Sequence, residues 1–151
     1  MDNTIIKFIV VNLIILVLFV YIAFKLRNWR LTSKGKQPQS FINFINNGQE
    51  LNYESIILGL IFGIIFGIID NLGLWIGLDK MKKYLPGDIK TKAALSNTYS
   101  NILGAIIGVS ITIIIESIID FDRIHDPLWI HPIGITIGCL LGIIFGELLF
   151  K

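Results

Sequence analysis

Two polar residues, Asp70 and Asn71, interrupt an otherwise apolar run, GLIFGIIFGIIDNLGLWIG, which covers residues 59–77. If that run crosses a membrane, a charged carboxylate inside it costs at least about 2.5–3.5 kcal/mol, so it needs a partner or stays protonated. Three roles for Asp70 are open: an interhelical hydrogen bond that stabilises the fold, a proton or cation site, and a position in a water-filled helix break.

A second polar pair, Glu116 and His131, is expected at similar depth, each about one helical turn from the same loop. A Glu–His contact is either a satisfied polar pair or a pH switch, because histidine titrates near neutral pH. Four further candidate cation ligands lie just outside this pair: Asp120, Asp122, His125 and Asp126. Their spacing fits no specific metal motif, so we assign no metal site.

Known catalytic and cofactor motifs are lacking in this sequence. It contains no GxSxG, HExxH, P-loop or dinucleotide-binding pattern. The single cysteine, Cys139, excludes an intramolecular disulfide and a cysteine metal cluster, and we expect it to pack inside a helix. A net charge of +2 does not favour nucleic-acid binding. We therefore predict no catalytic residues, no cofactor and no nucleic-acid partner.

The elements that must position these polar residues are membrane-spanning helices. Charged residues make up 16% of the chain, whereas soluble domains have about 25%. Apolar stretches of about 17–25 residues are long enough to cross a bilayer. The sequence predicts an all-α, polytopic membrane protein, a single membrane domain over 1–151, with four transmembrane helices. They cover about 5–24, 55–78, 99–119 and 128–150.

The first stretch is predicted to be a retained anchor, because bases follow it and no cleavage site does. Residues 25–54 read as a polar linker, in which SFINFINNG indicates a short amphipathic turn on the membrane surface. Four crossings place both termini on one side. The first two connecting loops carry five bases each and lie on opposite sides, so the positive-inside rule does not choose an orientation.

Helix boundaries are indicated at two further places. Pro86-Gly87-Asp88 predicts a turn, with Asp88 as the N-cap of a helix that continues into the third span. Asp126 and Pro127 predict the N-cap and first position of the fourth span. Because the second loop makes its flanking spans antiparallel neighbours, Asp70 and Asn71 are both expected to form hydrogen bonds with a polar group at matching depth. That group is Asn97, Ser100 and Asn101.

Small residues recur at every fourth position in the last three predicted spans. Residues four apart share one helix face, and in lipid small-xxx-small faces allow helix backbones to approach closely. The pattern favours glycine-zipper packing in a compact bundle, a homo-oligomer or a complex with other membrane proteins. The alternative is a hydrated pore lined by glycine backbone. The glycines concerned are Gly59, Gly63, Gly67, Gly104, Gly108, Gly134, Gly138, Gly142 and Gly146.

The segment DNLGLWIGLDKMKKYLPGDIKTKAALSNTYSNILGAIIG, residues 70–108, resembles a group of small multi-pass membrane proteins of large nucleocytoplasmic DNA viruses. The matching elements include Asp70-Asn71, Gly73-Leu74-Trp75, Leu85-Pro86 and Gly104-Ala105. The resemblance covers about a quarter of the chain. It implies a viral membrane protein, with the virion's internal membrane as a candidate location, and implies no activity.

Taken together, these patterns favour a non-enzymatic structural or assembly component of a membrane. The runner-up is a small ion or proton channel or transporter that uses Asp70 and Glu116. A membrane-remodelling or lysis protein of holin type is the third interpretation.

Overall fold

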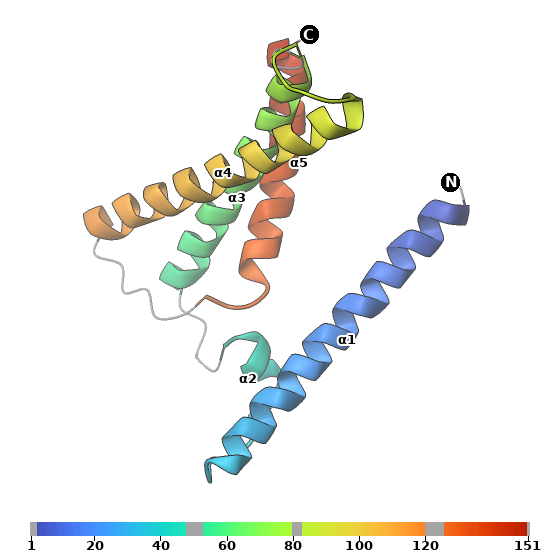
Figure 1. The fold of residues 1–151 in the computed structure, drawn as a ribbon. Coiled ribbons are helices and arrows are strands. Elements are labelled where there is room, and N and C mark those ends of the chain that lie inside the picture. The colour runs from blue at the N-terminus through green and yellow to red at the C-terminus, as the bar shows by residue number, and fades with distance from the viewer. Residues whose placement is uncertain (1–2, 48–52, 80–82, 120–125, 151) are drawn as a thin grey trace. The chain divides into compact units, whose positions relative to one another are not determined.

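The computed structural model describes residues 3–47, 53–79, 83–119 and 126–150, and every regular element in those ranges is an α-helix. The helices are α1 (Asn3–Ser33), α2 (Phe41–Ile45), α3 (Tyr53–Asp79), α4 (Ile89–Ile119) and α5 (Ile130–Phe150) (Figure 1). Four of them, all but α2, are long and apolar enough to cross a membrane. The predicted all-α class is confirmed. The chain divides into two compact units, 1–48 and 49–151, which we describe separately.

The first unit begins with α1, which continues nine residues past the predicted end of the first span, through Ser33. Part of the predicted linker is therefore helical. Gly35 ends the helix: its φ is +70°, in the left-handed region that glycine tolerates. The N–H groups of Gly35 and Lys36 donate to the carbonyls of Thr32 and Leu31, both at 3.0 Å. This Schellman pattern satisfies the last carbonyls of α1 and reverses the chain.

The reversed chain is fastened to α1 along its return path. The Asn28 side chain donates to Gln39 O at 3.0 Å and accepts from Gln39 N at 2.9 Å. Ser40 then caps α2 by accepting from Asn43 N at 3.2 Å. The predicted amphipathic turn is thus a short helix whose buried Phe44 lies with its ring centroid 5.5 Å from that of Phe24 on α1. The result is a closed helical hairpin at the end of α1.

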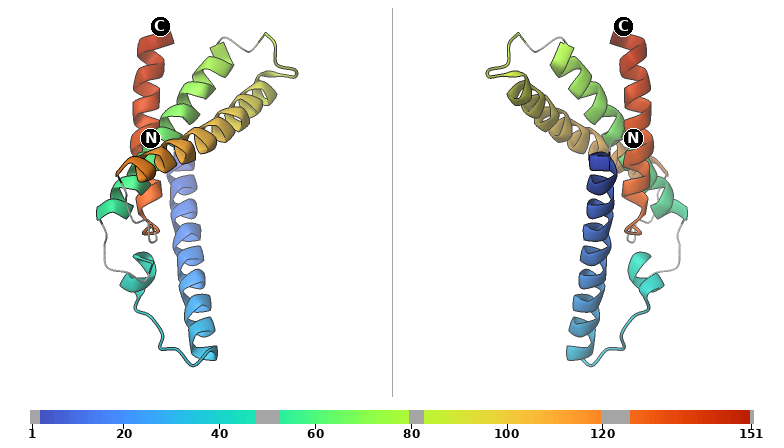
Figure 2. Two further views of the ribbon diagram at one scale, coloured as in Figure 1. Left: turned by 90° about the vertical axis from the view of Figure 1, so that its left-hand side faces the viewer. Right: turned by 90° about the vertical axis from the view of Figure 1, so that its right-hand side faces the viewer.

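The second unit is built around α3, which packs against both α4 and α5. Helices α3 and α4 are antiparallel, because Gly77, near the end of α3, lies against Ser96, and Phe62, nearer its start, lies against Gly108. Helix α5 instead runs parallel to α3, while α4 crosses α3 obliquely (Figures 1 and 2). Three successive crossings of a membrane require this alternation of directions.

The predicted turn at Pro86-Gly87-Asp88 is confirmed. Gly87 has a φ of +90°, and a Cβ there would lie 2.7 Å from Thr91 Cγ2. Asp88 caps α4, since Thr91 N donates to its Oδ1 at 2.8 Å. Hydrogen bonds from the side chain and backbone of Thr91 hold the pKa of the Asp88 carboxyl below its ordinary value of 3.8. Helix α4 therefore begins ten residues before the predicted third span.

Replacing Asp88 with alanine is expected to loosen the first turn of α4, because Thr91 N–H loses its acceptor. Asp88→Asn keeps an acceptor oxygen and serves as the control. Since the folded-state pKa is depressed, the cap contributes fully above pH 3.8 and its contribution is lost as the pH falls through the lower folded value. Amide hydrogen exchange at residues 89–92 measures the effect; equal protection in Asp88→Ala and Asp88→Asn would contradict it.

The start of α5 differs from the prediction. The helix begins at Ile130, three residues after Pro127, which was expected to open it. Ile130 N donates to Pro127 O at 3.2 Å, so a turn precedes the helix. Asp126 is not the predicted N-cap, because the helix begins four residues after it. One of its carboxylate oxygens, Oδ2, is instead 3.0 Å from His131 Nε2. The side chain of Asp126 therefore contacts a side chain in the first turn of α5 and does not cap the helix.

Candidate functional site

Backbone atoms of α3 and α5 approach each other closely along the glycine faces of the two helices. A Cβ on Gly63 would lie 2.8 Å from Gly134 Cα, and one on Gly67 would lie 2.6 Å from Cys139 N. A Cβ on Gly138 would collide with the backbone of Ile64. These glycines are buried. The backbones of α3 and α5 are therefore in direct contact, at a distance that any residue larger than glycine would not allow.

The same register continues at both ends of the α3–α5 contact. Gly59 lies against Ile130, at the start of α5, and a Cβ on Gly142 would be 2.9 Å from Asn71 Cβ. At the far end, the Trp75 ring lies over Gly146, with Cδ1 2.6 Å from where a Cβ would stand. Every step of four residues on α3 matches a step of four on α5. The pair is thus parallel and in fixed register over several turns.

Helix α4 contacts α3 in a different way. Its buried glycines face phenylalanines of α3: a Cβ on Gly108 would lie 3.1 Å from Phe62 Cδ2, and one on Gly104 would lie 3.0 Å from Phe66 O and 3.3 Å from Phe66 Cδ2. Toward the second loop, the glycines of the contact lie on α3 instead of α4. Gly73 and Gly77 of α3 contact serines of α4. Those serines are Ser100 and Ser96, both buried.

The sequence-based prediction missed Gly73 and Gly77 as contact residues. The signal that would have found them is the four-residue spacing of Gly73 and Gly77, matched by the four-residue spacing of Ser96 and Ser100. Both pairs are small-xxx-small patterns. They lie at the ends of their helices that are joined by the second loop, where an antiparallel pair necessarily meets.

Asp70 makes the hydrogen bond that the sequence predicted with the third span. Ser100 Oγ lies 2.9 Å from Asp70 Oδ1 and 3.0 Å from Asn97 O. Asp70 is half-buried and Ser100 fully buried. In the part of the chain that the structure describes, the side chains of Asn97 and Asn101 are not bonded to Asp70. Ser96 and Ser100 take the face toward α3, and the neighbouring asparagines are rotated away from it by about 100°.

Asn71 does not share the partner of Asp70, which corrects the prediction. Its Nδ2 donates to Cys139 O on α5 at 2.8 Å. The reason is in the spacing: Asn71 continues the row Gly59, Gly63, Gly67, and that row faces α5. Consecutive residues of α3 therefore bond to opposite neighbours, Asp70 to α4 and Asn71 to α5.

His131 was predicted to pair with Glu116, and this prediction is wrong. His131 Nε2 is 3.0 Å from Asp126 Oδ2, while Nδ1 is buried without a hydrogen-bond partner. The Phe62 ring meets the imidazole edge-on, with centroids 5.1 Å apart. Glu116 is half-buried on α4. Asp126 is only five residues from His131, so the local contact forms across the first turn of α5.

The predicted cation ligands cannot be placed as a group, since Asp120, Asp122 and His125 lie outside the described residues. Within the described ranges, no three His, Cys, Asp or Glu side chains are placed to hold a metal ion. Cys139 is half-buried with a free thiol, and its carbonyl accepts the bond from Asn71.

No protein-family model, curated protein or solved structure matches this chain. The resemblance of residues 70–108 to viral membrane proteins therefore stays a prediction. What the geometry itself offers is a set of interhelical contacts centred on α3. The polar atoms in the middle of that helix bridge to both neighbours, and its glycines bring the backbones together.

Proposed function

We propose that this chain is a non-enzymatic structural or assembly component of a membrane, acting through helix–helix association. One observation carries the proposal: both polar side chains in the middle of α3 are used to hold a neighbouring helix. Asp70 accepts from Ser100 on α4, and Asn71 donates to the carbonyl of Cys139 on α5. Groups engaged in this way position helices.

The glycine faces support the same proposal. In lipid, apolar side chains gain little by leaving lipid for one another, so helices associate through close van der Waals contact. Glycine lowers helix propensity by about 1 kcal/mol relative to alanine. Direct backbone approach, as between Gly63 and Gly134, offsets that loss. Glycine-zipper packing of α3, α4 and α5 is therefore part of the proposed function.

Association with other chains is also part of the proposal. Because the glycines of α3 and α5 face each other within one chain, a second copy or another membrane protein would use other faces. Apolar side chains such as Ile113 on α4 and Leu140 on α5 are exposed. In a bilayer these side chains contact lipid or a partner helix.

Reconstitution into lipid vesicles distinguishes this function from the channel or transporter alternative. We expect vesicles that contain the purified chain to hold proton and potassium gradients as long as protein-free vesicles do. A flux that Asp70→Asn abolishes and Ser110→Ala leaves intact would overturn the structural proposal in favour of ion conduction. Ser110 is a suitable control because its hydroxyl bonds within its own helix, to Ile106 O at 2.8 Å.

The resemblance of residues 70–108 extends the proposal to the internal membrane of a virion. Purified particles from the source, if it is viral, should then contain the chain in an amount comparable to other membrane components. Its absence from such particles would refute this extension and leave the structural role to be tested by reconstitution.

A further inference from the structure

The last turns of α1 carry a concentrated positive charge that the proposed function does not use. Lys25, Arg27, Arg30, Lys34 and Lys36 lie within twelve residues, and the chain has no aspartate or glutamate between positions 3 and 47. The described residues of the first unit therefore contain no carboxylate that could neutralise these bases internally. A charge of this density next to a membrane span attracts anionic headgroups.

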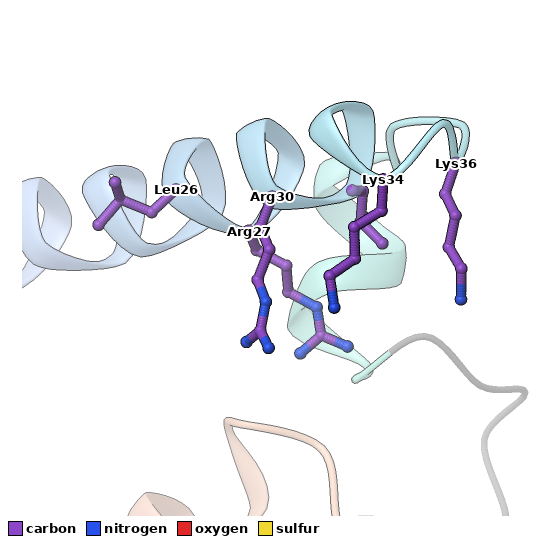
Figure 3. Close-up of a pocket in the computed structure, with 6 residues that line it drawn as sticks. Leu26, Arg27, Arg30, Lys34 and Lys36 are labelled. Carbon is purple, nitrogen blue, oxygen red and sulfur yellow. The ribbon is translucent and has the colours of Figure 1, made fainter.

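The bases converge on one pocket. Arg27, Arg30 and Lys34 are spaced three and four residues apart, so they share one face of α1. The Schellman turn at Gly35 brings Lys36 to the same side, and Figure 3 shows the four side chains extending in one direction from the backbone. With Leu26 and Leu31 they line a cavity of about 550 Å³. That volume is within the usual range for small-ligand sites.

The pocket is held by the hairpin of the first unit rather than by a loose tail. The two Asn28–Gln39 hydrogen bonds fasten the returning chain to α1, and Phe24 packs edge-on against Phe41 with centroids 5.4 Å apart. Arg27 also donates to Asn47 Oδ1 at 3.4 Å. Such prior ordering lowers the entropy lost when a ligand binds.

The position of this pocket along α1 matches the headgroup layer of a bilayer. Lys7 and Lys25 are eighteen positions apart on α1, which corresponds to about 27 Å, close to the thickness of the hydrocarbon core. Arg27 and Arg30 then lie about 3 and 7.5 Å farther along the axis, where phosphates of a bilayer are found.

We propose that this pocket binds the phosphate group of an anionic lipid. The guanidinium groups of Arg27 and Arg30 can each donate two parallel hydrogen bonds to phosphate oxygens, and Lys34 and Lys36 add point charges. Leu26, which lies nearer the apolar part of α1 than the two arginines, supplies apolar surface for the glycerol and upper acyl region. That apolar lining and the depth of the pocket favour a lipid headgroup over free phosphate as the source of the ligand.

Native mass spectrometry of the full chain in neutral detergent tests the proposal with phosphatidylglycerol and phosphatidylcholine of identical acyl chains. Phosphatidylglycerol should bind at least about tenfold more tightly than phosphatidylcholine. The double variant R27Q/R30Q should weaken phosphatidylglycerol binding by about thirtyfold, at roughly fivefold for each base lost. Both arginines are exposed, and the substitutions remove one hydrogen bond of the hairpin, Arg27–Asn47, so circular dichroism verifies that the fold is kept.

The matched control is K83Q/K90Q, which removes two exposed bases outside the pocket. It should change phosphatidylglycerol binding by less than about twofold. An equal loss in the two double variants would show diffuse attraction without a site, and would overturn the proposal. Equal affinity for the two lipids would also overturn it. Binding of inorganic phosphate to the lipid-free chain as tightly as that of phosphatidylglycerol would overturn the proposal and identify a free-phosphate site instead.

Discussion

Gly138→Ala is expected to lower the free energy of unfolding by about 2 kcal/mol, because there is no room for a methyl group between α3 and α5. The new Cβ would collide with the carbonyl oxygen of Ile64 and lie 2.8 Å from Ile64 Cα. Those atoms belong to a helix backbone and cannot rotate aside. The helices must separate, and the loss of contact extends to Gly63–Gly134 and to the Asn71–Cys139 hydrogen bond.

Reversible unfolding of the purified chain by sodium dodecyl sulfate in mixed micelles, followed by circular dichroism, measures this effect. The control is Gly108→Ala on α4, where the new Cβ would lie 3.1 Å from Cδ2, on the edge of the Phe62 ring. A ring can tilt by a few tenths of an ångström, so we expect a change of less than about 0.5 kcal/mol. Equal stability of the two variants would show that backbone contact is not what joins α3 to α5.

The presence of the long helices could be predicted from sequence because it depends on local properties. Runs of apolar residues of sufficient length indicate spans, and Asp88 after Pro86-Gly87 indicates a turn followed by a cap. The end of α1 was placed too early, at about residue 24, because hydropathy falls at Lys25 while helix-forming residues continue to Ser33. Hydropathy locates the apolar segment, whereas the helix continues until a residue such as Gly35 ends it.

Which neighbouring helix each face of α3 contacts could not be predicted in the same way. A four-residue spacing shows that Gly59, Gly63, Gly67 and Asn71 share a face, but it does not say which helix that face meets. Sequence proximity through the second loop suggested α4 for Asn71, whereas the row faces α5, which comes later in the chain. The Asp70–Ser100 contact was predictable because antiparallel neighbours joined by a loop bring groups of equal depth together. Pairing between parallel helices leaves no such local signal.

The Asp70–Ser100 hydrogen bond leads to the second large effect, which we expect in Ser100→Ala. Alanine keeps the Cβ that packs against Gly73 and removes only the hydroxyl that donates to Asp70 Oδ1. The carboxyl group then stays half-buried without this donor, and we expect a loss of about 1 kcal/mol in the same unfolding assay. Ser110→Ala is the control, since its exposed hydroxyl bonds within α4 and should contribute little.

A double-mutant cycle with Asp70→Ala separates the hydrogen bond from other effects of the serine. If the bond between α3 and α4 is the source of the stability, Ser100→Ala should cost almost nothing once Asp70 is absent. The same loss with and without Asp70 would mean that the hydroxyl acts through its second acceptor, Asn97 O, inside α4. In that case Asp70 would no longer count as a group engaged in holding helices, and the main support for a structural role over ion conduction would be lost.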